Sequence, residues 1–167
     1  MNDFKECYDI AESGKLEPFW DATYKFAFPN MTNQMKGRSG KCNSQNSGVD
    51  RIIYLENGKT VTVEEKVRTT SYPDIAIEYV SNDTTNSPGW IEKDLSVDYL
   101  AYAFLPIKTV YLFDWRMLKL TWKRNKDAWL SKYFIAHAQN EYYTTLSVCI
   151  PIDTLLESCK ESSIIRV

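Results

Sequence analysis

The pair Asn57-Gly58 constrains the fold of this chain more than any other feature of its sequence. It lies between two segments, 51–55 and 59–68, that are rich in valine, isoleucine and threonine, residues that favour β-strands. An asparagine-glycine pair between two such segments is one of the strongest local signals for a β-hairpin, because both residues accept a positive φ angle. We therefore predict two antiparallel strands joined by a short turn.

The charged side chains of this hairpin are arranged according to its register. Side chains alternate between the two faces of a strand, so Glu64 and Lys66 share one face of the second strand and Glu65 lies on the other. A two-residue turn would place Asp50, which precedes the first strand, opposite Glu65. A three-residue loop with Gly58 in the left-handed conformation would place Asp50 opposite Glu64. Only the second register, or an equivalent bulge or bend near Asp50, brings Asp50 to the face of Glu64 and Lys66.

The remaining sequence predicts one mixed sheet with helices packed on it. The spacing of apolar residues indicates two short helices within 4–28, helices at 90–105, 114–134 and 153–159, and strands at 74–81, 108–113 and 144–152. Residues 30–48 are rich in Asn, Ser, Gly, Lys and Gln, which predicts a long mobile loop. We expect the early strands to pair antiparallel and strand 108–113 to return parallel through a crossover. The predicted class is α/β (α+β), with a central mixed sheet of about five strands flanked by helices.

Length and composition indicate a single domain spanning residues 1–167. The hydrophobic content of 44% and the aromatic content of 14% exclude a largely disordered chain. No apolar run is long enough to span a membrane, and residues 1–6 are too polar for a secretory signal. We therefore expect a cytoplasmic protein that has no membrane partner.

The cysteines and the histidine exclude several kinds of site. The four cysteines are scattered without a Cys-x-x-Cys pair, which argues against a zinc cluster or a dense disulfide framework and indicates reduced thiols. His137 is the only histidine, so chemistries that need two histidines are excluded. We expect a partly buried structural role for His137.

The carboxylates and the lysine of the hairpin offer a different chemistry. The oxygens of Asp50 and Glu64 are hard ligands of the kind that bind Mg²⁺, for which Mn²⁺ can substitute. The ammonium group of Lys66 would orient or activate an attacking water. The simpler alternatives are a solvent-facing ion pair between Glu64 and Lys66, contributing about 0–1 kcal/mol, and a turn role for Asp50 after Ser47-Gly48.

This pattern resembles the restriction-endonuclease-like superfamily, the PD-(D/E)XK nucleases. The resemblance covers residues 47–113, in which Val49-Asp50 begins the hairpin and the apolar-led Val63-Glu64-Glu65-Lys66 lies on its second strand. It implies a restriction-endonuclease-like fold and a Mg²⁺-dependent nuclease that hydrolyses phosphodiester bonds, with DNA as the expected substrate. It also implies that Asp50, Glu64 and Lys66 are catalytic and that Asp50 and Glu64 bind the metal.

The chain departs from the superfamily pattern in three respects. No proline precedes Asp50, and the helical glutamine-tyrosine motif of one large nuclease branch is absent. Many members also have an acidic residue in an N-terminal helix, and four residues here meet that description loosely: Glu6, Glu12, Glu17 and Asp21.

Other charged residues are candidates for accessory roles. Glu78 would add a third acidic ligand, Lys93 would reach a phosphate, and Arg68 shares the strand face of Lys66, although a solvated position is the more frequent role of charged residues such as Glu78 and Lys93. The expected nucleic-acid contacts are the basic residues around the start of the hairpin: Lys36, Arg38, Lys41 and Arg51. The net charge of −2 argues against a passive nucleic-acid coating protein but not against a nuclease whose metal offsets its own carboxylates.

The helix predicted at 114–134 carries two further patterns. Trp115, Trp122 and Trp129 recur at seven-residue spacing, which predicts packing in the core or on a partner surface rather than base stacking. Four basic residues on the same helix are expected to form a solvated face: Lys119, Lys123, Arg124 and Lys126.

The main alternative to a nuclease is a non-catalytic interaction or nucleic-acid-binding protein on the same fold. In such a protein Asp50, Glu64 and Lys66 would point apart or be blocked by other side chains. The sequence leaves open whether the substrate is DNA or RNA and whether cleavage is internal or from an end. The small size favours recognition of nucleic-acid structure or ends, or a homodimer.

Overall fold

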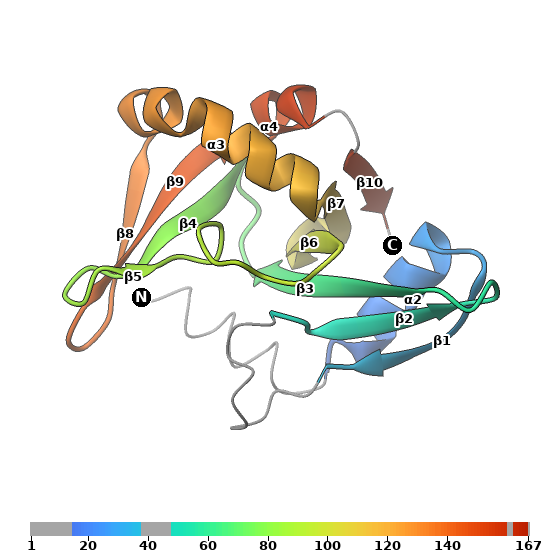
Figure 1. The fold of residues 1–167 in the computed structure, drawn as a ribbon. Helices are drawn as coiled ribbons and strands as arrows, with labels where there is room; N and C mark the ends of the chain where they lie inside the picture. Colours follow the sequence, from blue (N-terminus) through green and yellow to red (C-terminus); the bar gives the residue numbers. More distant parts are fainter. Residues whose placement is uncertain (1–14, 38–47, 160–161, 167) are drawn as a thin grey trace.

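The computed structural model describes residues 15–37, 48–159 and 162–166 of the chain. These residues form an α+β protein with three α-helices, a curled six-stranded mixed sheet and a four-stranded antiparallel sheet (Figure 1). The elements in chain order are α2 (Glu17–Ala27), β1 (Met31–Lys36), β2 (Arg51–Leu55), β3 (Thr60–Arg68), β4 (Asp74–Asn82), β5 (Ser87–Pro88), β6 (Tyr99–Phe104), the 3-10 helix η1 (Leu105–Ile107), β7 (Thr109–Asp114), α3 (Trp115–Lys132), β8 (Ile135–Gln139), β9 (Thr144–Pro151), α4 (Ile152–Ser158) and β10 (Ser162–Arg166).

The six-stranded sheet has the strand order β1-β2-β3-β6-β7-β10. All neighbouring strands pair antiparallel except β3 and β6, which run parallel with Val63 beside Tyr99. Parallel neighbours need a long connection, and here the connection includes β4 and β5 of the other sheet. The predicted parallel return of strand 108–113 is therefore wrong, because β7 pairs antiparallel with β6.

The four-stranded sheet has the order β5-β4-β9-β8 and is antiparallel throughout. The chain leaves the first sheet after Arg68 and enters the second at Asp74, as Figure 1 shows for β3 and β4. The expected single sheet of about five strands is therefore wrong, since the strands divide between two sheets.

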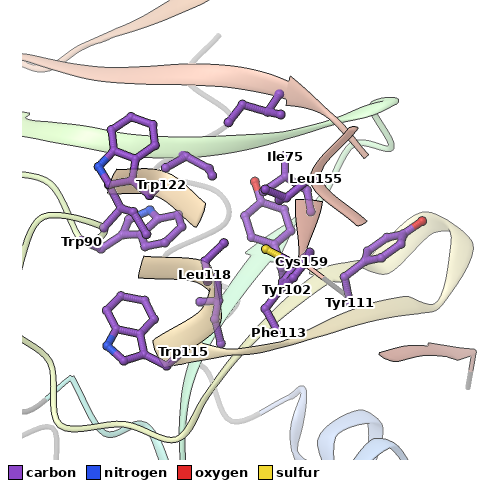
Figure 2. Close-up of a cluster of buried hydrophobic side chains, with 14 of the residues drawn as sticks. Ile75, Trp90, Tyr102, Tyr111, Phe113, Trp115, Leu118, Trp122, Leu155 and Cys159 are labelled. Carbon is purple, nitrogen blue, oxygen red and sulfur yellow. The ribbon is translucent and has the colours of Figure 1, made fainter. Parts of the chain in front are cut away.

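Two hydrophobic cores lie on opposite faces of the six-stranded sheet. The α3-side core joins both sheets and α3, and Figure 2 shows its Trp90, Trp115 and Trp122 near Leu118. The α2-side core lies between the sheet and α2 and includes Trp20, Tyr24, Ile53, Val63, Ala101, Ala103, Val110, Leu112 and Ile165. Strand β6 contributes alternate residues to each core, which the alternation of side chains along a strand requires.

Several predicted elements are confirmed close to their expected bounds. The hairpin β2–β3, the strands β4, β7 and β9 and the helices α3 and α4 all lie where the sequence placed them. Helix α3 begins after Asp114, whose side chain accepts a hydrogen bond from Met117 N at 2.8 Å and so caps the helix. Its three tryptophans are buried, as predicted, with 2–5% of each residue's surface exposed. Within the described residues no helix combines the length and the apolar character that crossing a membrane requires.

The helix predicted at 90–105 is wrong. Its second half is strand β6, which lies between β3 and β7 and has five of its six residues buried. A strand that is covered on both faces reads as a continuous apolar run, and such a run is hard to distinguish from a buried helix by periodicity alone. Asp98 marks the change, because its side chain accepts a hydrogen bond from Thr62 N at 2.8 Å and so fixes the start of β6 beside β3.

The sequence also missed strands at the edges of the sheets. Residues 31–36, predicted as part of a mobile loop, form the edge strand β1, whose Met-Thr-Asn-Gln-Met-Lys sequence leaves most of its side chains exposed. Strand β10 and the edge strand β8 were not predicted either, and His137 on β8 is exposed rather than partly buried. The first of the two helices predicted within 4–28 lies outside the described residues, whereas α2 confirms the second.

Candidate functional site

The turn of the β2–β3 hairpin has the three-residue form. Leu55 N donates to Lys59 O at 2.9 Å, Gly58 N donates to Leu55 O at 2.9 Å, and Gly58 has a φ of 76°. Arg51 consequently pairs with Val63, and the residue before it, Asp50, lies opposite Glu64. The register on which the predicted site depends is therefore confirmed.

Asp50, Glu64 and Lys66 meet at this end of the hairpin. Lys66 Nζ forms an ion pair with Glu64 Oε1. Asp50 N donates to Val63 O at 2.9 Å, and Asp50 Oδ2 accepts from Glu65 N at 2.8 Å, so both the backbone and the side chain of Asp50 are fixed against β3. Glu64 is buried with 7% of its surface exposed, while Asp50 and Lys66 are half-buried. The cluster is thus closed around Glu64 and open beside the other two residues.

The charged groups in this cluster alter one another's pKa values. Burial raises the pKa of Glu64 to about 7; the Lys66 ammonium opposes this rise, and the neighbouring Asp50 carboxylate adds to it. Burial alone would lower the pKa of Lys66, but the carboxylates of Glu64, Asp50 and Glu78 outweigh that effect and raise it. Two carboxylates that repel each other beside one lysine form a site at which a divalent cation would relieve the repulsion.

The donor set fits a magnesium ion that keeps most of its water. Mg²⁺ is commonly bound through one or two carboxylates with water completing its coordination, and Asp50 and Glu64 supply two carboxylates on neighbouring strands. Within the part of the chain that the structure describes, no group of three or more His, Cys, Asp or Glu side chains has the geometry of a metal site. Glu78 therefore does not form such a group with Asp50 and Glu64.

Glu78 instead connects the cluster to the segment that follows β5. Its side chain accepts from Trp90 N at 3.3 Å, and its backbone oxygen accepts from Ile91 N at 3.3 Å. Burial raises the pKa of Glu78, and the charges of Lys66 and Lys93 oppose the rise. The pairing of β4 with β9 is irregular immediately after Glu78, as at the bulges that often lie next to active sites. Glu78 thus interacts electrostatically with both lysines.

The segment that carries Lys93 is held in place by α3. Lys119 Nζ donates to Ile91 O at 2.7 Å and to Lys93 O at 3.0 Å. Glu92 Oε1 accepts from Trp122 Nε1 at 2.9 Å and from Lys126 Nζ at 2.6 Å. The prediction of a solvated basic face on α3 is therefore wrong for Lys119, whereas Lys126 is partly exposed and Lys123 and Arg124 are exposed.

Arg68 lies apart from the two candidate ligands. Its guanidinium carbon lies 5.0 Å from the centre of the Tyr72 ring. Burial raises the pKa of Asp74, and the charge of Arg68 opposes this rise, so Arg68 acts on the start of β4. The structure does not bring Arg68 to Asp50 and Glu64.

The predicted nucleic-acid contacts have separate outcomes. Arg51 is wrong as a surface contact, because its side chain is 2% exposed and lies on the α2 side of the sheet between Glu17 and Glu65. Lys36 is partly exposed at the sheet edge, with its Nζ 3.9 Å from Glu17 Oε1. Arg38 and Lys41 lie outside the described residues.

The N-terminal acids do not join the cluster where the structure describes them. Glu17 pairs with Arg51, and Asp21 accepts a hydrogen bond from Gln34, both on the opposite side of the six-stranded sheet from Glu64. Glu6 and Glu12 lie outside the described residues.

Gly48 is part of the site and was missed. Its φ is 59°, and a methyl group on its Cα would lie 2.8 Å from Leu95 Cδ1 and 3.1 Å from Glu64 Oε2. The chain before Asp50 therefore packs directly against the Glu64 carboxylate, which a larger residue would prevent. The signal for this contact was the glycine two positions before the aspartate.

Comparisons of the chain with protein-family models, with curated proteins and with solved structures found no match.

Proposed function

We propose that this protein is a metal-dependent nuclease that hydrolyses phosphodiester bonds, with DNA as its substrate, and that it belongs to the restriction-endonuclease-like superfamily. The observation that carries the proposal is the meeting of Asp50, Glu64 and Lys66 beside the first rung of the β2–β3 hairpin. An aspartate opposite the glutamate of a Glu-x-Lys strand is the arrangement that the sequence resemblance implied. The division of the strands into two sheets is a departure from the architecture expected of that superfamily.

Each of the three residues has a role that follows from its chemistry. Asp50 and Glu64 would hold Mg²⁺, which when bound lowers the pKa of a coordinated water and offsets negative charge on the phosphate. The pKa of Lys66 is raised, so its ammonium group stays charged at neutral pH. Lys66 would therefore orient the attacking water and stabilise the charge that develops on the phosphate, rather than remove a proton.

The same contacts argue against the non-catalytic alternative. That alternative required the three side chains to point apart or to be blocked. Here Lys66 forms an ion pair with Glu64, and Asp50 lies opposite Glu64. Asp50 and Lys66 also keep part of their surface exposed, so a substrate phosphate has access from their side.

Cleavage assays with matched variants test the proposal. The purified chain would be incubated with linear, single-stranded and branched DNA and with RNA, in Mg²⁺ and in Mn²⁺. Asp50→Asn and Lys66→Met should each reduce metal-dependent cleavage by on the order of 100-fold or more, because each removes a group that acts on the reacting phosphate. Lys59→Met and Asp94→Asn are the matched controls, since both residues are exposed and lie outside the cluster.

The result that supports the proposal is loss of cleavage in the two site variants with unchanged melting temperatures and full cleavage in both controls. Equal activity of Asp50→Asn and Asp94→Asn would place the chemistry elsewhere. Absence of cleavage by the wild-type chain on all of these substrates in both metals would overturn the proposed function.

A further inference from the structure

Arg51 is the largest fully buried side chain among the described residues. Its Nε donates to Glu65 Oε1 at 2.9 Å, and its Nη1 donates to Glu17 Oε2 at 2.6 Å. Tyr24 Oη donates to the same Glu65 oxygen at 3.0 Å. We call these four residues the Arg51 network; Glu17 and Tyr24 belong to α2, Arg51 begins β2, and Glu65 lies in the middle of β3.

Stability alone gives a weak reason for this network. Taking a guanidinium and a carboxylate out of water costs free energy that their attraction only partly returns, and apolar side chains of similar size often serve the fold as well or better. The surroundings of Arg51 are the α2-side core, where apolar replacements would find partners such as Trp20 and Ile53. The value of the network is therefore expected to lie in the geometry that it imposes.

That geometry concerns the candidate metal site directly. Arg51 follows Asp50, and Glu65 follows Glu64, so Arg51 and Glu65 are the sequence neighbours of the two proposed ligands. Because side chains alternate along a strand, the network contacts β2 and β3 on the α2 side of the sheet, while the side chains of Asp50 and Glu64 project from the opposite face. The backbone at this point also carries the hydrogen bond from Glu65 N to Asp50 Oδ2 at 2.8 Å.

We propose that the Arg51 network positions the metal ligands. It fixes the start of β2 against β3 from the α2 side of the sheet and so holds Asp50 and Glu64 at the separation that one divalent cation requires. Its residues touch neither the metal nor the substrate. This inference rests on the proposed function, because it assumes that Asp50 and Glu64 bind a metal. It goes further by assigning the affinity for the metal to residues on the opposite face of the sheet.

A charge-neutral double variant separates positioning from stability and from the electrostatic field. Arg51→Met combined with Glu65→Met removes one positive and one negative charge and leaves no unpaired charge between them, so the chain is expected to fold. Glu17 remains partly exposed and can be hydrated. We expect the double variant to bind Mn²⁺ about 10- to 100-fold more weakly than the wild type, the loss that removal of groups supporting metal ligands typically causes. Electron paramagnetic resonance of free Mn²⁺ measures this affinity without any assay of cleavage.

The matched control is a second ion pair away from the hairpin. Glu92→Met combined with Lys126→Met also removes one charge of each sign, at a pair between α3 and the segment before β6. This control should bind Mn²⁺ with wild-type affinity. Tyr24→Phe is a further charge-neutral change, which deletes only the hydroxyl that donates to Glu65 and should weaken Mn²⁺ binding several-fold.

The outcomes are distinguishable. Weaker Mn²⁺ binding by the folded network variants, with an unchanged control, supports the inference. Wild-type affinity in the folded double variant overturns it, and if the double variant does not fold, wild-type affinity in Tyr24→Phe overturns it. A wild-type chain that binds no Mn²⁺ contradicts the metal site itself, and with it both proposals, whereas a wild type that binds Mn²⁺ but cleaves nothing contradicts only the proposed function.

Discussion

Glu64 and Glu65 are identical residues that β3 places in opposite surroundings. Glu64 pairs with Lys66 beside Asp50, whereas Glu65 is held by Arg51 and Tyr24 on the other face of the sheet. Burial raises the pKa of both carboxyl groups, and the Asp50 carboxylate adds to both rises; the Arg51 guanidinium opposes the rise at Glu65, and the Lys66 ammonium opposes it at Glu64. Glu65 is thus paired with a buried guanidinium, whereas Glu64 is paired with an ammonium group that is partly exposed.

Two glycines allow a prediction at the level of single residues. Gly58 has a φ of 76° and open space around its Cα, so Gly58→Ala should cost only the strain of the left-handed backbone, about 1–2 kcal/mol in the free energy of unfolding. At Gly89 a methyl group would lie 2.3 Å from Glu78 O, and Gly89→Ala should cost about 3 kcal/mol or more because the β4 backbone must move. Urea denaturation measures both values, and a greater loss at Gly58 would contradict the prediction.

At the residue scale, the sequence could predict which side chains share a face but not what they meet there. Alternation along a strand separates Glu64 from Glu65, and it depends on backbone geometry alone. The register that brings Asp50 to Glu64 could be narrowed to two turn forms, of which the three-residue loop at Gly58 is the one that forms. The burial of Arg51 depends on the docking of α2 against that face of the sheet, a long-range contact that no local pattern reports.

Among the elements, α3 does more than cover the core. Through Lys119, Trp122 and Lys126 it holds the irregular segment that carries Lys93 toward Glu78. A segment without regular structure has backbone groups to satisfy, and here the helix satisfies two of its carbonyl oxygens. The order of this segment between β5 and β6 therefore depends on α3.

The pH dependence of this contact gives a prediction at the element scale. Burial would raise the pKa of Glu92, but hydrogen bonds from Lys126 and Trp122 outweigh it and lower the pKa below the ordinary value of 4.5. A charged Glu92 therefore stabilises the folded chain above about pH 4.5, and this contribution is lost as the pH falls through the lower folded-state pKa.

The variant Glu92→Gln tests this expectation. It should reduce the free energy of unfolding at pH 7 by less than about 1 kcal/mol, because both partners are partly exposed and screened. The difference from wild type should shrink toward pH 3 in urea denaturation. The control Glu157→Gln, at an exposed position on α4, should show no such trend. A Glu92→Gln deficit that grows on acidification would contradict the assigned sign.

Elements with strong local signals could be predicted, and those defined by their neighbours could not. The hairpin and α3 have a turn signal and a long apolar period, respectively, and both are confirmed. Strand β6 is apolar because β3 and β7 flank it and both of its faces are covered, so its sequence resembled a helix. Strand β1 is polar because it lies at an edge, so its sequence resembled a loop.

At the scale of the whole molecule, both sheets contribute to the α3-side core, and the six-stranded sheet separates this core from the α2-side core. The division into two sheets could not be predicted, because it depends on β4 pairing with β9 rather than with the preceding strand β3. Strand β6 connects the cores, since Leu100 and Phe104 lie in the α3-side core and Ala101 and Ala103 in the α2-side core. Strand β7 does the same, with Tyr111 and Phe113 in the α3-side core and Val110 and Leu112 in the α2-side core, so a disturbance in one core reaches the other through shared strands.

This arrangement predicts that the two cores unfold together. Ile53 is fully buried in the α2-side core, so Ile53→Ala should lower the free energy of unfolding by about 2–5 kcal/mol. In a Trp20→Phe background the remaining tryptophans, Trp90, Trp115, Trp122 and Trp129, all report from the α3-side core. Because the cores share β6, Ile53→Ala should shift the urea midpoint of their fluorescence as far as it shifts the midpoint of far-ultraviolet circular dichroism, with the slope of the transition unchanged.

The converse variant completes the test. Leu118→Ala empties part of the α3-side core, where Leu118 is fully buried, and should shift both signals by the same amount. A tryptophan transition that stays in place in Ile53→Ala while circular dichroism shifts would mean that the sheet face beneath α2 unfolds on its own. Val63, which lies next to Glu64 in β3, belongs to the α2-side core. The end of the hairpin that carries Asp50 and Glu64 would then unfold while the rest of the molecule stayed folded. Cooperative unfolding of both cores instead means that the rung carrying Asp50 and Glu64 is as stable as the whole molecule.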